Sequence, residues 1–120
     1  MTPDLAFRPE RLPLRAPFRI SRGVKIHAEV VVAELSQDGA TGRGECVPYA
    51  RYGETLDSVC AQLAQAATNL GRGAPVAEVL AAMPAGAARN ALDCAAWDLV
   101  ARRDGVSVGA RLRRPPPPAF

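Results

Sequence analysis

The sequence predicts an α+β domain in which a three-stranded antiparallel meander is followed by about three helices. β-Branched residues and a hairpin turn occupy residues 5–47, whereas residues 55–104 carry apolar residues at helical spacing. Because the strands come first, we expect the helices to pack on one face of the sheet. The chain has 120 residues, of which 48% are hydrophobic, and this is enough for one domain with its own core.

The first two strands differ in the strength of their signal. Residues 5–15 alternate loosely and contain two prolines, so they predict an edge strand. Residues 16–24 include a proline, a serine and a glycine, and we expect a loop there. Residues 25–35 are rich in valine and other β-forming residues and give the strongest strand signal of the chain.

A hairpin is expected to join the second strand to the third. Asp38 and Gly39 form a dipeptide that favours a tight turn between antiparallel strands. Residues 41–47 then return as the third strand. Gly42 and Gly44 share one face of it, because alternate residues of a strand point the same way.

The helical half contains recognisable start and stop signals. Thr55 is suited to cap a first helix, which we expect to end at Gly71. Pro75 is expected to start a short second helix, and a third should cover residues 87–104 with Trp97 as its large anchor. The buried stripe of this third helix is predicted to consist of Ala88, Ala91, Leu92, Ala95 and Leu99.

Positive charge is concentrated near the N-terminus. The formal net charge is only +3, yet six basic residues and a single acid lie from Arg8 to Lys25. This stretch is either a solvated strand and loop or a surface that attracts a carboxylate ligand, and both readings stay open. The chain has no basic helix and no aromatic residues interleaved with its basic ones, so we expect no nucleic-acid partner.

The cysteine and histidine content argues against a metal site in this chain. Cys46, Cys60 and Cys94 are odd in number and lack metal-ligand or redox spacing, and His27, the single histidine, is expected to be structural or exposed. We expect reduced thiols in a cytoplasmic protein. No signal peptide is visible, and no stretch approaches the roughly 20 apolar residues that cross a bilayer, so no membrane partner is expected.

Several stretches resemble one known family in both order and spacing. They are Pro17-Phe18, Ser21-Arg22-Gly23, Val30-Val31-Val32-Ala33-Glu34-Leu35, Gly42-Arg43-Gly44-Glu45-Cys46-Val47-Pro48-Tyr49, Arg51-Tyr52-Gly53-Glu54-Thr55, and Gly86-Ala87-Ala88-Arg89-Asn90-Ala91-Leu92-Asp93-Cys94-Ala95-Ala96-Trp97-Asp98-Leu99. Together they resemble the N-terminal domain of the mandelate racemase/muconate lactonizing enzyme branch of the enolase superfamily, and most of all dipeptide epimerases of the L-Ala-D/L-Glu type. The resemblance covers about residues 5–112.

The resemblance implies a two-domain enzyme of cell-wall peptide metabolism. In this family the N-terminal domain caps a barrel and supplies two loops that close over the dipeptide. The barrel supplies the lysines that move the α-proton and the three carboxylates that hold Mg²⁺, and the metal stabilises the resulting enolate. The implied partners of this chain are therefore a C-terminal barrel domain and a small dipeptide, and assembly as a homo-oligomer stays open.

The chemical groups of that barrel are missing from this chain. Lys25 is the only lysine, so two opposed lysine bases are impossible. No three acids are placed at the ends of successive parallel strands. We therefore expect no catalytic residue and no metal ligand here, and no activity from the chain alone. Residues 1–112 are expected to form the cap, and residues 113–120, with four prolines, a linker toward the absent barrel.

The first candidate substrate-binding loop spans residues 16–25. The family places a cation on this loop opposite a carboxylate of the substrate, and the matching position here is Lys25, with Arg22 as a second candidate. A lysine can pair with a carboxylate as a point charge, although it lacks the two-pronged geometry of arginine. The alternative is a solvated lysine at the start of a strand.

The second candidate loop spans residues 49–54. Tyr52, Arg51 and Tyr49 make it amphipathic, which is typical of a mobile lid whose aromatic side chains exclude water from a charged ligand. The alternative is a surface loop whose tyrosines pack on the third strand.

Two acids of the third helix, Asp93 and Asp98, are five residues apart and so do not share a face. We expect them to anchor the helix through hydrogen bonds to backbone or to the barrel, rather than to form an acid/base pair. The cap hypothesis also predicts apolar surface on the strand meander and on the outer face of this helix.

Two other functions compete with this hypothesis. The chain could be the cap of an N-acylamino-acid racemase, an o-succinylbenzoate synthase or a muconate cycloisomerase, because the cap loops alone discriminate poorly among these enzymes. It could also be a free-standing α+β binding module without catalysis, since fold resemblance does not by itself convey activity.

Overall fold

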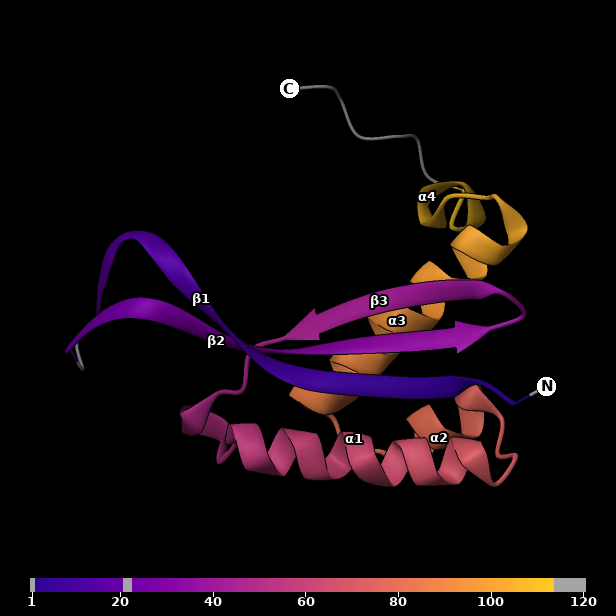
Figure 1. Ribbon diagram of the computed structural model, residues 1–120, viewed down its shortest axis with the longest axis horizontal. Coiled ribbons are helices and arrows are strands. Elements are labelled where there is room, and N and C mark those ends of the chain that lie inside the picture. Colours follow the sequence, from indigo (N-terminus) through magenta and orange to yellow (C-terminus); the bar gives the residue numbers. More distant parts are fainter. Residues whose placement is uncertain (1, 21–22, 114–120) are drawn as a thin grey trace.

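Three antiparallel strands form a sheet in the order β1-β2-β3, and helices pack against it (Figure 1). The computed structural model describes residues 2–20 and 23–113. The predicted α+β class, with strands before helices, is confirmed. The elements are β1 (Asp4–Ile20), β2 (Gly23–Gln37), β3 (Ala40–Cys46), the 3₁₀ helix η1 (Ala50–Tyr52), α1 (Leu56–Gly71), α2 (Val76–Ala82), α3 (Ala87–Asp104) and α4 (Val108–Arg111).

The β2–β3 hairpin forms as its sequence predicts. Asp38 and Gly39 form its turn, and both have positive φ angles, 54° and 81°. Positive φ at both central residues matches the twist of the flanking strands, which explains the Asp-Gly dipeptide. The register then pairs Leu35 with Gly42 and Val31 with Cys46.

Two glycines of β3 allow α3 to lie directly on the sheet. A Cβ atom on Gly42 would lie 2.1 Å from the carbonyl oxygen of Ala95, and one on Gly44 would lie 2.0 Å from that of Ala91. Real Cβ atoms never approach backbone so closely, so only glycine fits at these two positions. The shared face predicted for Gly42 and Gly44 is therefore the face that receives α3.

The core lies between one face of the sheet and the two long helices. From β2 it contains Val31, Ala33 and Leu35, all fully buried. The predicted stripe of α3 is confirmed, because each of its five residues is buried. The contribution of α1 consists of Val59, Leu63, Ala66 and Leu70.

Trp97 does not anchor α3, and that prediction is wrong. Its side chain is 40% exposed. Residue 97 lies two positions from both Ala95 and Leu99, which places it on the side of the helix that faces away from the sheet. The outer face of α3 therefore carries an apolar side chain, as the cap hypothesis predicts.

The prediction of a loop at residues 16–24 is also wrong. β1 continues to Ile20 and β2 begins at Gly23, so that the two strands form a ribbon extending beyond the end of β3 (Figure 1). Pairing shifts register between Pro13 and Phe18 and then resumes with Phe18 opposite Lys25. β1 lies at the edge of the sheet, where proline is tolerated, and the register shift accommodates the irregular sequence.

The helix ends differ slightly from expectation. Thr55 caps α1 as predicted, and its side chain and that of Ser58 bond reciprocally to each other's backbone N–H. Gly71 is the last residue of α1 rather than its stop, and Arg72 follows as the C-cap. The four-residue helix α4, capped by Ser107, was not predicted because it is too short to give a periodic signal.

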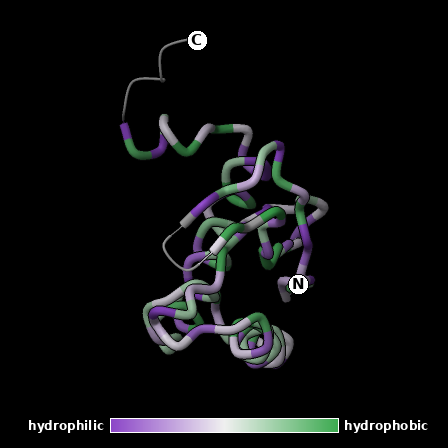
Figure 2. Tube along the Cα trace, turned by 90° about the vertical axis from the view of Figure 1, so that its left-hand side faces the viewer, coloured by the Kyte–Doolittle hydropathy of each residue, from purple (hydrophilic) through white to green (hydrophobic). Residues whose placement is uncertain are grey.

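Hydrophobic residues, green in Figure 2, recur along the strands and helices rather than forming one continuous block. Among the described residues, no helix combines the length and the apolar character that a membrane crossing requires. Most of the expected linker, from residue 114 onward, lies outside the described residues.

Candidate functional site

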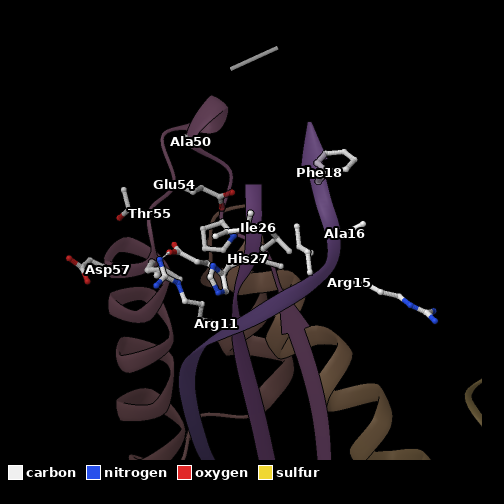
Figure 3. A pocket seen from close by; sticks show the side chains of 16 residues that line it. Arg11, Arg15, Ala16, Phe18, Ile26, His27, Ala50, Glu54, Thr55 and Asp57 are labelled. Carbon is white, nitrogen blue, oxygen red and sulfur yellow. Dashed lines mark ion pairs between the residues drawn. The ribbon is translucent and has the colours of Figure 1, made fainter. Parts of the chain in front are cut away.

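A groove of about 1050 Å³ opens between the β1–β2 ribbon and the segment that leads from β3 into α1 (Figure 3). It exists because α1 begins only at Leu56, so the helix covers the sheet but not the ribbon beyond it. The ribbon wall includes Arg11, Arg15, Phe18, Ile26, His27 and Glu29, and the opposite wall includes Val47, Pro48, Ala50, Glu54, Thr55 and Asp57.

The charged groups of the groove come from three elements. Arg11 and Glu29 pair across the ribbon at 3.6 Å, and both side chains are largely exposed, so this ion pair contributes little to stability. Figure 3 shows Arg11 and His27 on the side nearer the start of α1, whereas Arg15 points away. With Asp57 in the first turn of α1, both signs of charge line the groove.

Exposed apolar side chains gather on the two segments that flank the groove, and three of them, Phe18, Ile26 and Val47, line it. Of the ten large hydrophobic side chains exposed in the described part of the chain, seven lie on the ribbon or on residues 47–52. These are Leu12, Phe18, Val24, Ile26, Val47, Tyr49 and Tyr52. A concentration of this kind marks a surface that meets a ligand or a partner, and it agrees with the apolar surface predicted for the meander.

A compact turn, residues 49–54, carries the two tyrosines. The backbone N–H groups of Tyr52 and Glu54 donate to the carbonyl of Tyr49 at 3.0 and 3.1 Å, and Gly53 donates to Ala50 at 2.9 Å. Gly53 has a φ of 75°, a left-handed conformation that favours glycine. The rings of Tyr49 and Tyr52 lie 6.0 Å apart at 54°, within the range of a favourable aromatic pair.

Glu54 connects this turn to α3, a role that sequence reasoning missed. Its Oε1 accepts a hydrogen bond from the backbone N–H of Tyr49 at 3.1 Å, and its Oε2 accepts one from Ala87 at 2.8 Å. One feature of the sequence could have indicated this role. Gly86 precedes α3 and has no side chain that could cap the helix, so the helix needs an acceptor from another residue.

The predicted substrate-binding residues lie beside the groove rather than in its lining, as far as the structure describes them. Tyr49 precedes η1, and Arg51 and Tyr52 belong to η1, all three with exposed side chains. None of these three is among the residues that line the groove. Lys25 lies in β2 opposite Phe18, but its side chain is not among those described. Arg22 lies outside the described residues. The structure thus brings the rings of Tyr49 and Tyr52 together on the turn next to the groove and places Lys25 on the ribbon.

The pKa values of Cys46 and Asp98 are shifted from their usual ranges. Burial raises the pKa of the Cys46 thiol to about 11, and the negative charge of Glu54 adds to this shift. Asp98 has a lowered pKa, chiefly because the backbone N–H of Arg43 donates to its Oδ2 at 2.8 Å, with Arg102 as a second donor. Asp98 therefore anchors α3 to β3, as predicted, while Asp93 is exposed.

The described residues do not fit a magnesium site. Within residues 2–20 and 23–113, no three His, Cys, Asp or Glu side chains gather closely enough to hold a metal ion. The three cysteines are free thiols, with Cys46 buried and Cys94 exposed.

A three-stranded sheet backed by helices, with a groove between the extended ribbon and the turn that leads into α1, defines an α+β domain. Residues 3–112 match the mandelate racemase / muconate lactonizing enzyme N-terminal domain, and the chain belongs to this family. The predicted family resemblance is therefore confirmed.

Its relatives include enzymes that invert amino-acid centres. The chain is 52% identical over 99 residues to L-Ala-D/L-Glu epimerase of Escherichia coli K12, covering 82% of this chain and 31% of that protein. It is 38% identical over 87 residues to N-acetyl-D-glutamate racemase of Pseudoalteromonas, covering 71% and 28%. The chain thus spans about a third of the length of these relatives.

The similar solved structures also include a dipeptide epimerase and a homologue of dipeptide epimerases. An enolase family member from Agrobacterium tumefaciens with homology to dipeptide epimerases, solved with L-Ala-L-Glu, is 40% identical with a TM-score of 0.84, over 94% of this chain and 35% of that one. A dipeptide epimerase from Cytophaga hutchinsonii, complexed with Mg and D-Ala-L-Val, is 25% identical with a TM-score of 0.80, over 94% and 33%.

Proposed function

We propose that this domain is the substrate-closing cap of a dipeptide epimerase of the L-Ala-D/L-Glu type, which inverts an α-carbon by removing and returning its proton. The observation that carries the proposal is the 52% identity over 99 residues to the E. coli enzyme. The groove supports it, because its rim combines aromatic and aliphatic side chains with charges of both signs, as a zwitterionic dipeptide would require.

The cap residues have distinct proposed roles. Lys25 pairs with a carboxylate of the dipeptide, and Arg22 and Arg51 add positive charge for the anionic substrate. Tyr49 and Tyr52 exclude water above the substrate, which strengthens the charge interactions beneath them. The exposure of both tyrosines, 57% and 74%, supports this role, because nothing else in the described chain covers them.

Proton transfer is assigned to a barrel domain outside this chain. The chain has one lysine, and its described residues do not form a metal-ligand set, so we place both the opposed bases and Mg²⁺ on the barrel. Residues 1–112 act as the cap in this proposal, and residues 113–120 as the linker to the barrel.

A chimera tests the proposal. This chain would replace the matching region of the E. coli epimerase, and inversion of L-Ala-L-Glu would be followed by NMR with Mg²⁺ present. We expect the chimera to interconvert the two epimers. A chimera that folds and binds Mg²⁺ but leaves the dipeptide unchanged would reject the proposal.

The second candidate is the cap of an N-acylamino-acid racemase, which the 38% identity to the Pseudoalteromonas racemase favours. An acylated amino acid has no free amino group, so it needs only the cationic part of the groove. Offering N-acetyl-D-glutamate and L-Ala-L-Glu to this cap joined to its own barrel domain separates the two, because the true substrate should show the higher kcat/KM. Tight dipeptide binding by the isolated chain would instead favour a free-standing binding module.

A further inference from the structure

We propose that Glu54 is a positioning residue that holds the tyrosine-bearing turn, residues 49–54, in place at the wall of the groove by tying it to the first turn of α3. The inference deepens the proposed function, on which its link to substrate rests. Glu54 itself is not assigned any contact with the substrate.

The two oxygens of one carboxylate serve two distant segments. Oε1 accepts from the N–H of Tyr49, five residues earlier, and Oε2 accepts from the N–H of Ala87, 33 residues later. Bonds from a carboxylate to backbone N–H groups are charge-assisted and stronger than neutral ones. The half-buried position of Glu54 in the groove wall limits competition from water.

The start of α3 is built to receive this carboxylate. Gly86 supplies no capping side chain, so the first N–H groups of the helix need an acceptor from elsewhere. A negative charge at a helix N-terminus is also favoured by the helix dipole. A Cβ atom on Gly86 would lie 2.9 Å from Oε2 of Glu54, so any larger residue there would crowd the carboxylate.

Glu54 also forms hydrogen bonds with both backbone groups of Tyr49, and these bonds close the turn. The N–H of Tyr49 donates to the Glu54 side chain, and its carbonyl accepts from the Glu54 backbone N–H at 3.1 Å. The turn is thereby fixed to α3, which in turn rests directly on Gly42 and Gly44 of β3. The rings of Tyr49 and Tyr52 are held in position relative to the sheet, which is the preorganisation that a closing surface requires.

Glu54→Gln removes one acceptor at nearly constant volume, because the amide NH₂ cannot accept a hydrogen bond. Amide hydrogen exchange, measured by NMR on the full chain, should be at least tenfold faster at Tyr49 or Ala87, while Val31 and Ala33 in β2 keep their protection. Glu78→Gln on α2 removes the same charge far from the groove and should change neither amide. Unchanged exchange at both Tyr49 and Ala87 would overturn the proposal.

A kinetic measurement separates positioning from simple stabilisation. In the chimera described above, Glu54→Gln should raise KM for the dipeptide about tenfold at unchanged Tm, whereas Glu78→Gln should not. A fall in Tm with an unchanged KM would show a merely structural role and overturn the proposal. An inactive wild-type chimera would reject the proposed function instead, and the exchange experiment would still decide whether Glu54 holds the turn.

Discussion

Asp98 joins α3 to β3 through a single oxygen. Its Oδ2 accepts from the backbone N–H of Arg43 at 2.8 Å and from Nε of Arg102 at 2.9 Å. We expect Asp98→Ala to lower the free energy of unfolding by about 1–2 kcal/mol, because it leaves the Arg43 N–H without its charged acceptor. Asp93→Ala on the same helix is the matched control, and urea denaturation measures both. Equal losses for the two variants would contradict this role.

The contribution of Asp98 should depend on pH. Its pKa is lowered in the folded protein, so the stabilisation is present above the unfolded value of about 3.9 and is lost as the pH falls through the lower folded value. The difference in stability between wild type and Asp98→Ala should therefore be constant from pH 5 to 7 and shrink below about pH 4. A stability difference between wild type and Asp98→Ala that grows as the pH falls would contradict this prediction.

Cys46 should be the least reactive thiol. Burial, with the charge of Glu54, raises its pKa to about 11, whereas Cys94 is exposed. At pH 8 we expect iodoacetamide to modify Cys94 at least tenfold faster than Cys46, because only the thiolate attacks. Because the folded pKa is the higher one, the stability that the neutral thiol confers is present below about pH 8.5 and is lost as the pH rises toward 11. Mass spectrometry of quenched samples gives the order of modification, and faster labelling of Cys46 would contradict its burial.

At the scale of elements, the contact between β3 and α3 is the most restrictive in the fold. Gly44→Ala would place a Cβ 2.0 Å from the carbonyl of Ala91, and we expect a loss of about 3 kcal/mol in unfolding free energy. Gly71→Ala is the control, because it adds a Cβ in open space at the end of α1 and should stabilise by up to about 1 kcal/mol. Thermal unfolding should move the two variants in opposite directions, and a tolerated Gly44→Ala would refute the close packing.

Elements set by local rules could be predicted from sequence, and elements set by distant contacts could not. The Asp38-Gly39 turn and the buried stripe of α3 follow from dihedral preference and helical period, so both are confirmed. The ribbon beyond Pro13 depends on a register shift between two strands, which no local pattern specifies. Trp97 was misplaced because its size, rather than its position on the helix, suggested burial.

At the scale of the whole molecule, the sequence indicated only some of the residues at the candidate site. The family resemblance indicated Tyr49, Tyr52 and Lys25, and they lie on the turn and the ribbon that flank the groove, although the two tyrosines are not among its lining residues. The bond between Glu54 and Ala87 spans 33 residues and arises only when the turn meets α3. Ala16 and Phe18 join the groove wall because β1 continues through residues for which the sequence predicts a loop.

The proposed function would account for the apolar surface that is left uncovered. On that proposal, the exposed residues of the ribbon and the turn, together with Trp97 on α3, are covered by substrate and by a barrel domain. The groups that move protons would then lie on the barrel.

The most direct test is deuterium exchange at the α-carbon of L-Ala-L-Glu in D₂O with Mg²⁺, followed by NMR for the purified chain and for the chimera with the E. coli enzyme. We expect exchange by the chimera and none above background by the chain of 120 residues. Incorporation of deuterium catalysed by the chain alone would contradict this expectation.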